Sequence, residues 1–272
     1  MPELPEVETI VRELDAALPG RRIRRVQVFR ADALGGVPVA RFRAALEGRT
    51  FRHVRRQGKF LLFELEPPGY LIGHLRMTGK FAVSPPLPKP LPYHRVWFEL
   101  EDGALLVFQD MRCFGTLAVV ERLRDYAPLA ALGVDPFSRH FTAHWLAEAL
   151  AASRTPLKHW LMDQSKVAGL GNIYVAEILY DARLSPLRTA NTLIAAEVER
   201  LYRAVRRILR KAIHKSGTTI RDFRRVDQKT GQFQNFLRVY GKAGQPCPSC
   251  RTPIARVVQQ QRSTFYCPTC QR

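Results

Sequence analysis

The first residues of the chain combine a nucleophile with an acid. Met1 precedes Pro2, a small residue that usually permits removal of the initiator methionine, so we expect a mature chain that begins with a secondary amine. An α-amino group titrates near ~8, against ~10.4 for lysine, so a much larger fraction of it is unprotonated at neutral pH. A secondary amine that condenses with an aldehyde carbon gives a charged iminium, which favours a following elimination. Glu3 stands next to this amine and can donate or accept a proton.

The same residue types also have a structural explanation. Pro2 and Pro5 suit the start of a helix, and Glu3 and Glu6 interact favourably with its dipole. Residue types alone therefore leave both readings of the N-terminus open. Lys59 heads an apolar strand at 60–63, where it can lie close to the same site.

A second chemical pattern lies at the C-terminus. Cys-Pro-Ser-Cys at 247–250 and Cys-Pro-Thr-Cys at 267–270 are separated by sixteen residues, which is typical of two knuckles that bind one tetrahedral zinc ion. Four thiolates close the coordination shell, so we expect one structural zinc and no organic cofactor. Between the pairs, 254–258 and 263–266 are expected to form a β-hairpin with Arg262 at its turn, where a cation can meet a phosphate. The predicted ligands are Cys247, Cys250, Cys267 and Cys270.

The elements that position these groups follow from hydrophobic spacing. Apolar residues at helical intervals predict one helix from Pro5 to Leu18. Short β-rich runs separated by Gly, Pro and Asp-Gly then predict a β-sandwich or barrel, at 59–65, 70–75, 96–100, 104–108 and 117–120. The proline-rich stretch 84–92 is expected in an exposed connection. Helical spacing follows at 141–150, 156–162, 172–181 and 193–215.

The composition indicates the kind of partner. The chain has 272 residues and is 46% hydrophobic, which is enough for compact cores, and its 43 Lys and Arg against 24 Asp and Glu give a net charge of +19. We therefore expect a polyanion, with nucleic acid first. The sequence shows no apolar run of transmembrane length, no lipidation signal and no hydrophobic leader, so we expect no membrane partner. Together with the clustered cysteines, this predicts a cytoplasmic, nucleoid-associated protein.

Five segments together carry a family likeness. They are the opening Pro-Glu-Leu-Pro-Glu-Val-Glu-Thr, Gly-Lys-Phe-Leu-Leu at 58–62, His-Leu-Arg-Met-Thr-Gly at 74–79, Gly-Leu-Gly-Asn-Ile-Tyr at 169–174 and the four-cysteine finger. In this order they resemble bacterial formamidopyrimidine-DNA glycosylase over essentially the whole chain. The resemblance implies a two-domain α+β fold with an N-terminal helix and β-sandwich (1–132), a helix–two-turns–helix domain (133–216), a lesion-capping loop and connector (217–242) and a β-hairpin zinc finger (243–272).

The resemblance also implies an activity in base excision repair. A monomer would act on damaged double-stranded DNA, excising 8-oxoguanine opposite cytosine and formamidopyrimidines. Pro2 would attack the sugar C1′, and Glu3 would serve as acid and base. Lys59 matches a cation that the family assigns to β-elimination, and Arg262 matches one assigned to δ-elimination and phosphate binding.

Further residues are assigned by the same resemblance. Because the sugar of a stacked nucleotide cannot be reached, the nucleotide must be flipped out and the gap filled. Met77, Arg112 and Phe114 match the family's three void-filling residues. Met111 and Cys113 depart from the family pattern beside them. The DNA-binding set is His74, Tyr93, His94, Arg154, Lys158 and Asn172. The lesion-base pocket is assigned to Glu6, Thr218, Thr219 and Arg221.

Two alternatives remain at this point. An endonuclease VIII-type enzyme for oxidised pyrimidines would use the same Pro2 and Glu3 chemistry. A non-catalytic, zinc-containing DNA-binding protein would explain the charge, the finger and the helices, but it would not need a free Pro2.

Overall fold

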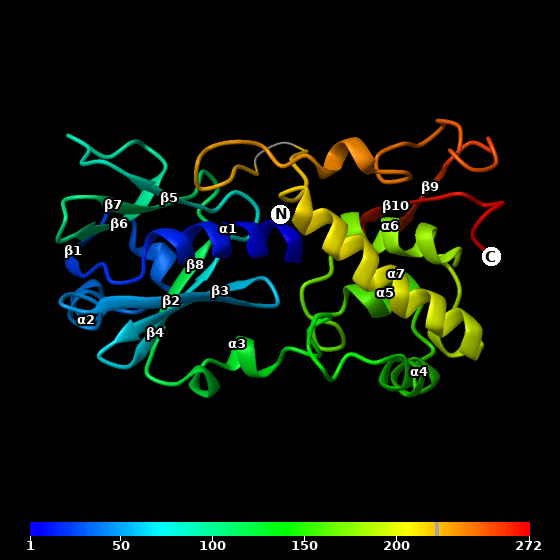
Figure 1. Ribbon diagram of the computed structural model, residues 1–272, viewed down its shortest axis with the longest axis horizontal. Helices are drawn as coiled ribbons and strands as arrows, with labels where there is room; N and C mark the ends of the chain where they lie inside the picture. Colours follow the sequence, from blue (N-terminus) through cyan, green and yellow to red (C-terminus); the bar gives the residue numbers. More distant parts are fainter. Residues whose placement is uncertain (221–222) are drawn as a thin grey trace. The chain divides into compact units, whose positions relative to one another are not determined.

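The computed structural model describes residues 1–220 and 223–272 (Figure 1). Contacts divide the chain into two compact units. Unit 1 comprises Met1–Ala130 and Lys215–Gln232, and unit 2 comprises Ala131–His214 and Phe233–Arg272. Within the described residues, no helix is both long and apolar enough to span a membrane.

Unit 1 is built on two antiparallel sheets of four strands each. One sheet has the order β1 (Ile23–Val28), β6 (His94–Leu100), β7 (Leu105–Gln109) and β5 (Lys80–Ser84). The other has the order β2 (Thr50–Gln57), β3 (Phe60–Glu66), β4 (Gly69–His74) and β8 (Thr116–Val120). Among the described residues the eight strands fall into two separate sheets, which meet only at the single bridge between Arg22 and Thr50, so the unit is a sandwich rather than a closed barrel. The predicted fold class is confirmed. Its core includes Phe51, Phe63, Phe81, Phe98 and Phe108, each at most 1% exposed.

The helix predicted at the N-terminus is α1 (Leu4–Ala17), which packs along β2 and β3 (Figure 1). Its buried stripe of Val7, Ile10, Val11 and Leu14 faces the core. Arg56 of β2 donates to the Glu8 carboxylate of α1 at 2.9 Å, which fixes the helix against the sheet. Unit 1 also contains η1 (Ala31–Leu34), α2 (Val39–Ala44), η2 (Leu123–Asp125) and α3 (Ala127–Ala130).

Several elements of unit 1 carry no clear pattern in the sequence. β1, β2, β5 and α2 lie outside the predicted runs. β1 and β2 each contain a register shift, between Ile23 and Arg25 and between Phe51 and His53, so their buried side chains do not alternate strictly. The proline-rich stretch after Ser84 does form an exposed connection, as predicted.

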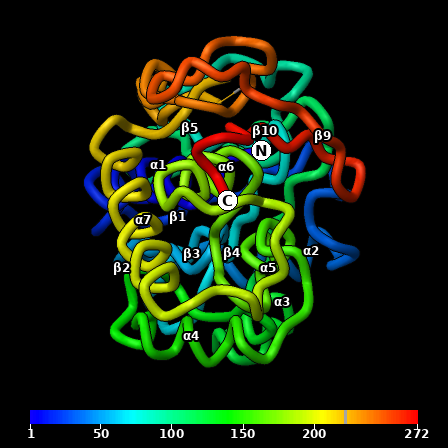
Figure 2. Tube along the Cα trace, turned by 90° about the vertical axis from the view of Figure 1, so that its right-hand side faces the viewer, coloured from blue at the N-terminus to red at the C-terminus, as the bar shows by residue number. Residues whose placement is uncertain are grey.

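Unit 2 is helical and ends in a two-stranded hairpin. It contains α4 (Ala143–Ala151), α5 (Leu157–Met162), α6 (Asn172–Ala182), η3 (Ala190–Thr192), α7 (Ala195–His214), η4 (Phe233–Phe236), β9 (Ala255–Gln259) and β10 (Arg262–Tyr266). The helix predicted from residue 141 starts at Ala143, because the Thr142 hydroxyl accepts from Trp145 N at 3.0 Å and caps it. α6 lies between α7 and β10, and the C-terminus returns beside α6 (Figure 2).

Candidate functional site

The start of α1 places Pro2 and Glu3 at the positive end of a helix dipole. Glu3 is the N-cap residue and is only 4% exposed. A capping box fixes it, because its side chain accepts from the Glu6 amide while the Glu6 carboxylate accepts from Glu3 N at 2.8 Å. A buried carboxylate is thus held immediately after a buried Pro2, and the preceding Met1 is 41% exposed. A secondary amine created at Pro2 would have an acid beside it.

Lys59 and His74 lie next to each other at one end of the second sheet. Lys59 occupies the turn between β2 and β3, and the following residue, Phe60, pairs with His74 in the register of β3 and β4. Both Lys59 and His74 are less than 10% exposed. Burial, followed by the cations of Arg76 and Lys59, lowers the pKa of His74 to about 3. Its Nδ1 accepts from Arg76 N at 3.1 Å, so a neutral His74 carries its proton on Nε2, where it can donate to a phosphate.

The three predicted void-filling residues lie on two turns of unit 1. Met77 is in the turn between β4 and β5 and is 39% exposed. Arg112 and Phe114 are in the turn between β7 and β8, where Phe114 is 51% exposed. The Arg112 guanidinium lies 4.8 Å from the centre of the Phe114 ring. Exposed apolar side chains of this size are suited to insertion between bases.

Asp110 organises these turns, and sequence reasoning missed it. Its carboxylate is 1% exposed and accepts from Arg112 N at 3.0 Å, from Gly115 N at 2.6 Å and from the Thr78 hydroxyl. Thr78 directly follows Met77, so one buried carboxylate holds both turns. The available signal was an aspartate two residues before Arg112 and five before a glycine, a spacing common in side chain to backbone turns.

Other members of the predicted set in unit 1 differ in exposure. Tyr93 is 37% exposed, whereas His94 is 3% exposed and its Nδ1 accepts from Trp97 Nε1 at 2.9 Å. Burial lowers the pKa of His94. Cys113, the departure from the family pattern, is half-buried with a φ of 57°.

The predicted lesion-base residues are brought together in part. Thr218 N donates to Glu6 Oε1 at 2.6 Å, and Glu6 and Thr218 are 2% and 3% exposed. The Thr219 hydroxyl donates to Phe223 O at 3.1 Å. The fourth residue of the set, Arg221, lies outside the described residues. Glu6 therefore joins the N-terminal capping box to the segment around Thr218.

In unit 2, Lys158 and Asn172 converge on the zinc hairpin. Lys158 Nζ donates to Thr264 Oγ1 at 2.6 Å, and Asn172 Nδ2 donates to Ser263 O at 3.0 Å. Lys158 is 1% exposed, and burial together with the Arg262 cation lowers its pKa to about 8. Arg262 itself is exposed at the start of β10, next to these bonds. Arg154 is exposed in the connection between α4 and α5.

The four cysteines of the finger form one cluster. All four Sγ atoms lie within 4.8 Å of one another, with 3.9 Å between Cys247 and Cys270 and 3.4 Å between Cys250 and Cys267. Zinc–sulfur bonds of about 2.3 Å in a tetrahedron require sulfur–sulfur distances of about 3.8 Å, so the cluster fits zinc. With four thiolates the site is structural and offers no position for a reactive water.

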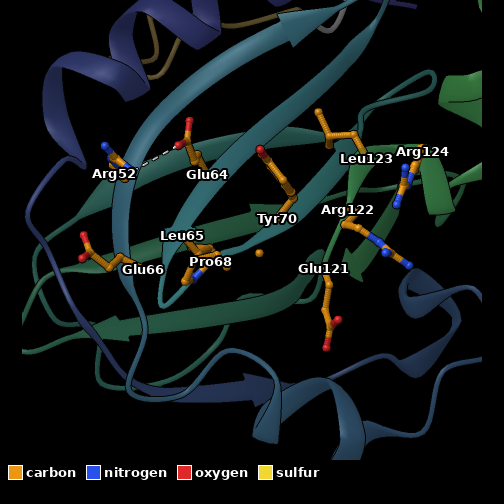
Figure 3. A pocket seen from close by; sticks show the side chains of 11 residues that line it. Arg52, Glu64, Leu65, Glu66, Pro68, Tyr70, Glu121, Arg122, Leu123 and Arg124 are labelled. Atoms are coloured by element: carbon orange, nitrogen blue, oxygen red, sulfur yellow. Dashed lines mark ion pairs between the residues drawn. The ribbon is translucent and has the colours of Figure 1, made fainter.

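A shallow groove in unit 1 lies apart from all of these residues. It has a volume of about 460 Å³ and lies beside Tyr70 at the ends of β3, β4 and β8 (Figure 3). Arg52 and Glu64 form an ion pair of 3.7 Å across part of it. Both acidic and basic side chains line it, and it contains none of the predicted site residues that the structure describes.

Comparison with known proteins gives a consistent result along the chain. Residues 1–117 match the formamidopyrimidine-DNA glycosylase N-terminal domain, 132–224 match its H2TH domain, and 244–272 match the zinc finger found in FPG and IleRS. The formamidopyrimidine-DNA glycosylase of Symbiobacterium thermophilum is 44% identical over 100% of this chain and 89% of its own length.

Solved structures agree with the sequence matches. The MutM (FPG) protein of Thermus thermophilus is 42% identical, with a TM-score of 0.89 and 99% and 98% of the two chains covered. A Lactococcus lactis FPG variant in complex with a Fapy-dG containing DNA is 33% identical, with a TM-score of 0.93 and full coverage of both chains. These matches, the sandwich, the helical unit and the four-cysteine finger together confirm the predicted resemblance. The chain therefore belongs to the formamidopyrimidine-DNA glycosylase family of DNA-repair enzymes.

Proposed function

We propose that this chain excises oxidised purines, namely 8-oxoguanine opposite cytosine and formamidopyrimidines, and then cuts the DNA strand at the resulting site. The observation that carries the proposal is the buried Glu3 carboxylate, fixed by a capping box directly after Pro2. Family membership supports the same activity, and relatives such as the L. lactis enzyme have been solved with damaged DNA.

The reaction begins once Met1 has been removed. The Pro2 nitrogen attacks C1′ of the damaged nucleotide, the bond from C1′ to the base breaks, and the base leaves with a proton. Glu3 protonates the sugar ring oxygen as the ring opens, which leaves an iminium between Pro2 and C1′. Loss of a C2′ proton then breaks the C3′–O bond, and a second elimination breaks the C5′–O bond. Lys59 assists the first elimination and Arg262 the second.

The damaged nucleotide has to leave the helix before this chemistry. Flipping costs a few kcal/mol, which the void-filling residues offset by occupying the gap. Met77 and Phe114 are exposed on their turns, as insertion requires. Arg112 presents donors to the unpaired cytosine, and Glu6, Thr218 and Thr219 contact the extruded base.

The backbone around the lesion is bound through several donors. His74 donates from Nε2, and exposed Arg154 and Arg262 supply charge. Lys158 contributes by holding Thr264 of the hairpin, because its ammonium is buried. Tyr93, His94 and Asn172 complete the set. We propose that the protein works as a monomer and that its charge of +19 associates it with the nucleoid.

Trapping of the intermediate tests the proposal. Borohydride added to the protein and an 8-oxoguanine:cytosine duplex should reduce the iminium to a stable protein–DNA adduct. Glu3→Gln should lose base excision, and Glu148→Gln, at a glutamate of α4 whose side chain is 69% exposed, serves as the control. A wild-type protein that binds the duplex but forms no adduct would overturn the proposal. The proposal would also be overturned if mass spectrometry of the active protein showed a retained Met1 or a blocked N-terminal amine.

A parallel reaction tests the substrate class. A duplex that contains thymine glycol should be cut more slowly than one that contains 8-oxoguanine. The reverse order would assign the chain to oxidised pyrimidines, with the same Pro2 chemistry.

A further inference from the structure

A carboxylate with no part in the chemistry above joins α1 to the segment 215–232. Glu13 lies near the end of α1, and its Oε2 accepts from Val226 N at 2.8 Å. Its Oε1 accepts from Arg225 Nε. The side chains of Glu13 and Arg225 are 20% and 27% exposed, so this pair is largely shielded from solvent. Charge-assisted bonds in such surroundings are stronger than exposed ion pairs.

The same segment is attached to α1 at a second point. Glu6 accepts from Thr218 N at 2.6 Å, and a Cβ at Gly217 would lie 2.8 Å from Glu6 Oε1. Glu6 and Glu13 are seven residues apart, which is about two turns of helix, so both project from the same face of α1. Phe223, which lies between the two attachments, is 9% exposed and belongs to the core cluster of unit 1. Val226, at the Glu13 attachment, packs against the same cluster.

The Glu6 attachment leads directly to the proposed catalytic pair. The Glu6 carboxylate accepts from Thr218 N and also from Glu3 N. The position of Thr218 is therefore tied to the residue that follows Pro2. A contact that fixes the course of 223–231 also limits how far Thr218 and Thr219 can move, because Gly231 N donates to Thr219 Oγ1 at 2.9 Å.

We propose that Glu13 is a positioning residue for base excision. By binding Arg225 and the Val226 amide, it keeps Thr218 and Thr219 against Glu6, where the extruded base is held. This inference rests on the proposed function. A base must be held while its bond to C1′ breaks, whereas a preformed abasic site carries no base. Loss of Glu13 therefore slows excision of 8-oxoguanine and leaves cleavage of an abasic site unchanged.

Two variants and one control separate this positioning role from a general loss of protein stability. Glu13→Ala removes both bonds while keeping a good helix former in α1. Arg225→Gln breaks the ion pair from the other side and leaves α1 untouched. Arg12→Ala is the control, because Arg12 forms an exposed pair with Glu8 on the same helix and is 65% exposed. The readouts are single-turnover excision of 8-oxoguanine, cleavage of a preformed abasic site, and hydrogen exchange of the Val226 and Thr218 amides.

We expect the variants to slow excision of 8-oxoguanine and to leave cleavage of the preformed abasic site unchanged. In Glu13→Ala the Val226 amide should exchange at least about tenfold faster and excision should slow by about tenfold, since each charge-assisted bond contributes on this scale. Arg225→Gln should shift both in the same direction by a smaller factor, and Arg12→Ala should change neither. An equal loss of both reactions, or unchanged excision despite faster exchange, would overturn the proposal. Absence of any wild-type adduct with borohydride would instead overturn the proposed function, and the exchange data would still report on the contact.

Discussion

The Asp110 carboxylate holds the two turns that carry the proposed void-filling residues, so Asp110→Asn should loosen both. The substitution keeps the size of the side chain and replaces one acceptor oxygen with an NH₂ donor. If the remaining oxygen still accepts from Arg112 N and the Thr78 hydroxyl, the new NH₂ group faces Gly115 N. In the wild type, the Asp110 oxygen at that position lies 2.6 Å from Gly115 N. Two donors then face each other, and Gly115 lies in a closely packed position, since a Cβ added there would lie 2.7 Å from Phe108 Cζ.

The loss of local stability in Asp110→Asn can be worked out from the hydrogen bonds that the Asp110 carboxylate accepts. Bonds to a charged group contribute about 1.5–3 kcal/mol each and neutral ones about 1 kcal/mol. Asp110→Asn loses the Gly115 bond and weakens the other two, which amounts to about 3 kcal/mol of local stability. Since about 1.4 kcal/mol corresponds to a factor of ten, the Gly115 amide should exchange about 100-fold faster. The Asp110 side chain is 1% exposed, so solvent cannot replace the lost partner readily.

Hydrogen exchange of the 109–116 peptide measures this effect, and DNA binding measures its consequence. The proposed function implies that the protein binds an abasic analogue more tightly opposite cytosine than opposite adenine. With Arg112 less fixed in Asp110→Asn, this difference in affinity should shrink. Asp102→Asn is the matched control, because Asp102 also accepts a backbone bond, from Ala104 N at 3.0 Å, but its side chain is 49% exposed. A change of less than about threefold in Gly115 exchange would refute the assigned role of this carboxylate.

Three further outcomes are expected. The pKa of His74 is lowered to about 3 by burial and two neighbouring cations, below its unfolded value of 6.5, so its contribution to stability is present above pH 6.5 and lost as the pH falls towards 3. Thermal unfolding of His74→Gln should therefore depend less on pH between about 4 and 6.5 than that of the wild type. Lys158→Ala should weaken DNA binding without changing its salt dependence, because the ammonium is buried, whereas exposed Arg262→Ala should lower the salt slope by ~1. Removal of zinc by a chelator should speed hydrogen exchange in β9 and β10 and abolish DNA binding, and re-addition of zinc should restore both.

The parts of the fold that the sequence predicted are those with strong local signals. α1 and the longer helices of unit 2 have helical spacing over several turns, and two Cys-x-x-Cys pairs allow few arrangements. Spacing alone did not distinguish a sandwich from a barrel, because both are made of the same short strands. That distinction depends on which strands pair, and pairs such as β1 with β6 join residues about seventy positions apart.

In the candidate site, too, the sequence predicted the residues with local patterns and missed those whose partners lie far along the chain. Pro2 and Glu3 could be named from their types and their place before a helix, and the capping box is a local pattern. Glu177 could not be assigned a role from the sequence. It is 2% exposed and accepts the amides of Arg238, Val239 and Tyr240 at 2.9–3.0 Å, and burial raises its pKa. In the sequence it is one more glutamate on an amphipathic helix, because its partners lie more than sixty residues away.

These carboxylates share a feature that bears on the basic character of the chain. Glu6, Asp110 and Glu177 are each at most 2% exposed. Glu6 and Glu177 accept backbone amides from distant segments, and Asp110 accepts two amides of its own turn and the Thr78 hydroxyl of another turn. Glu13 also accepts the amide of a distant residue, Val226, at a largely shielded position. Acids in such positions hold turns and connections in place and face little solvent. Lys59, Arg95 and Lys158 are buried as well, so among the described residues burial leaves the net positive charge of the surface close to that of the whole chain, +19. In a protein of a DNA-repair family, this arrangement fixes turns and connections with negative charge that is largely shielded from a phosphate backbone.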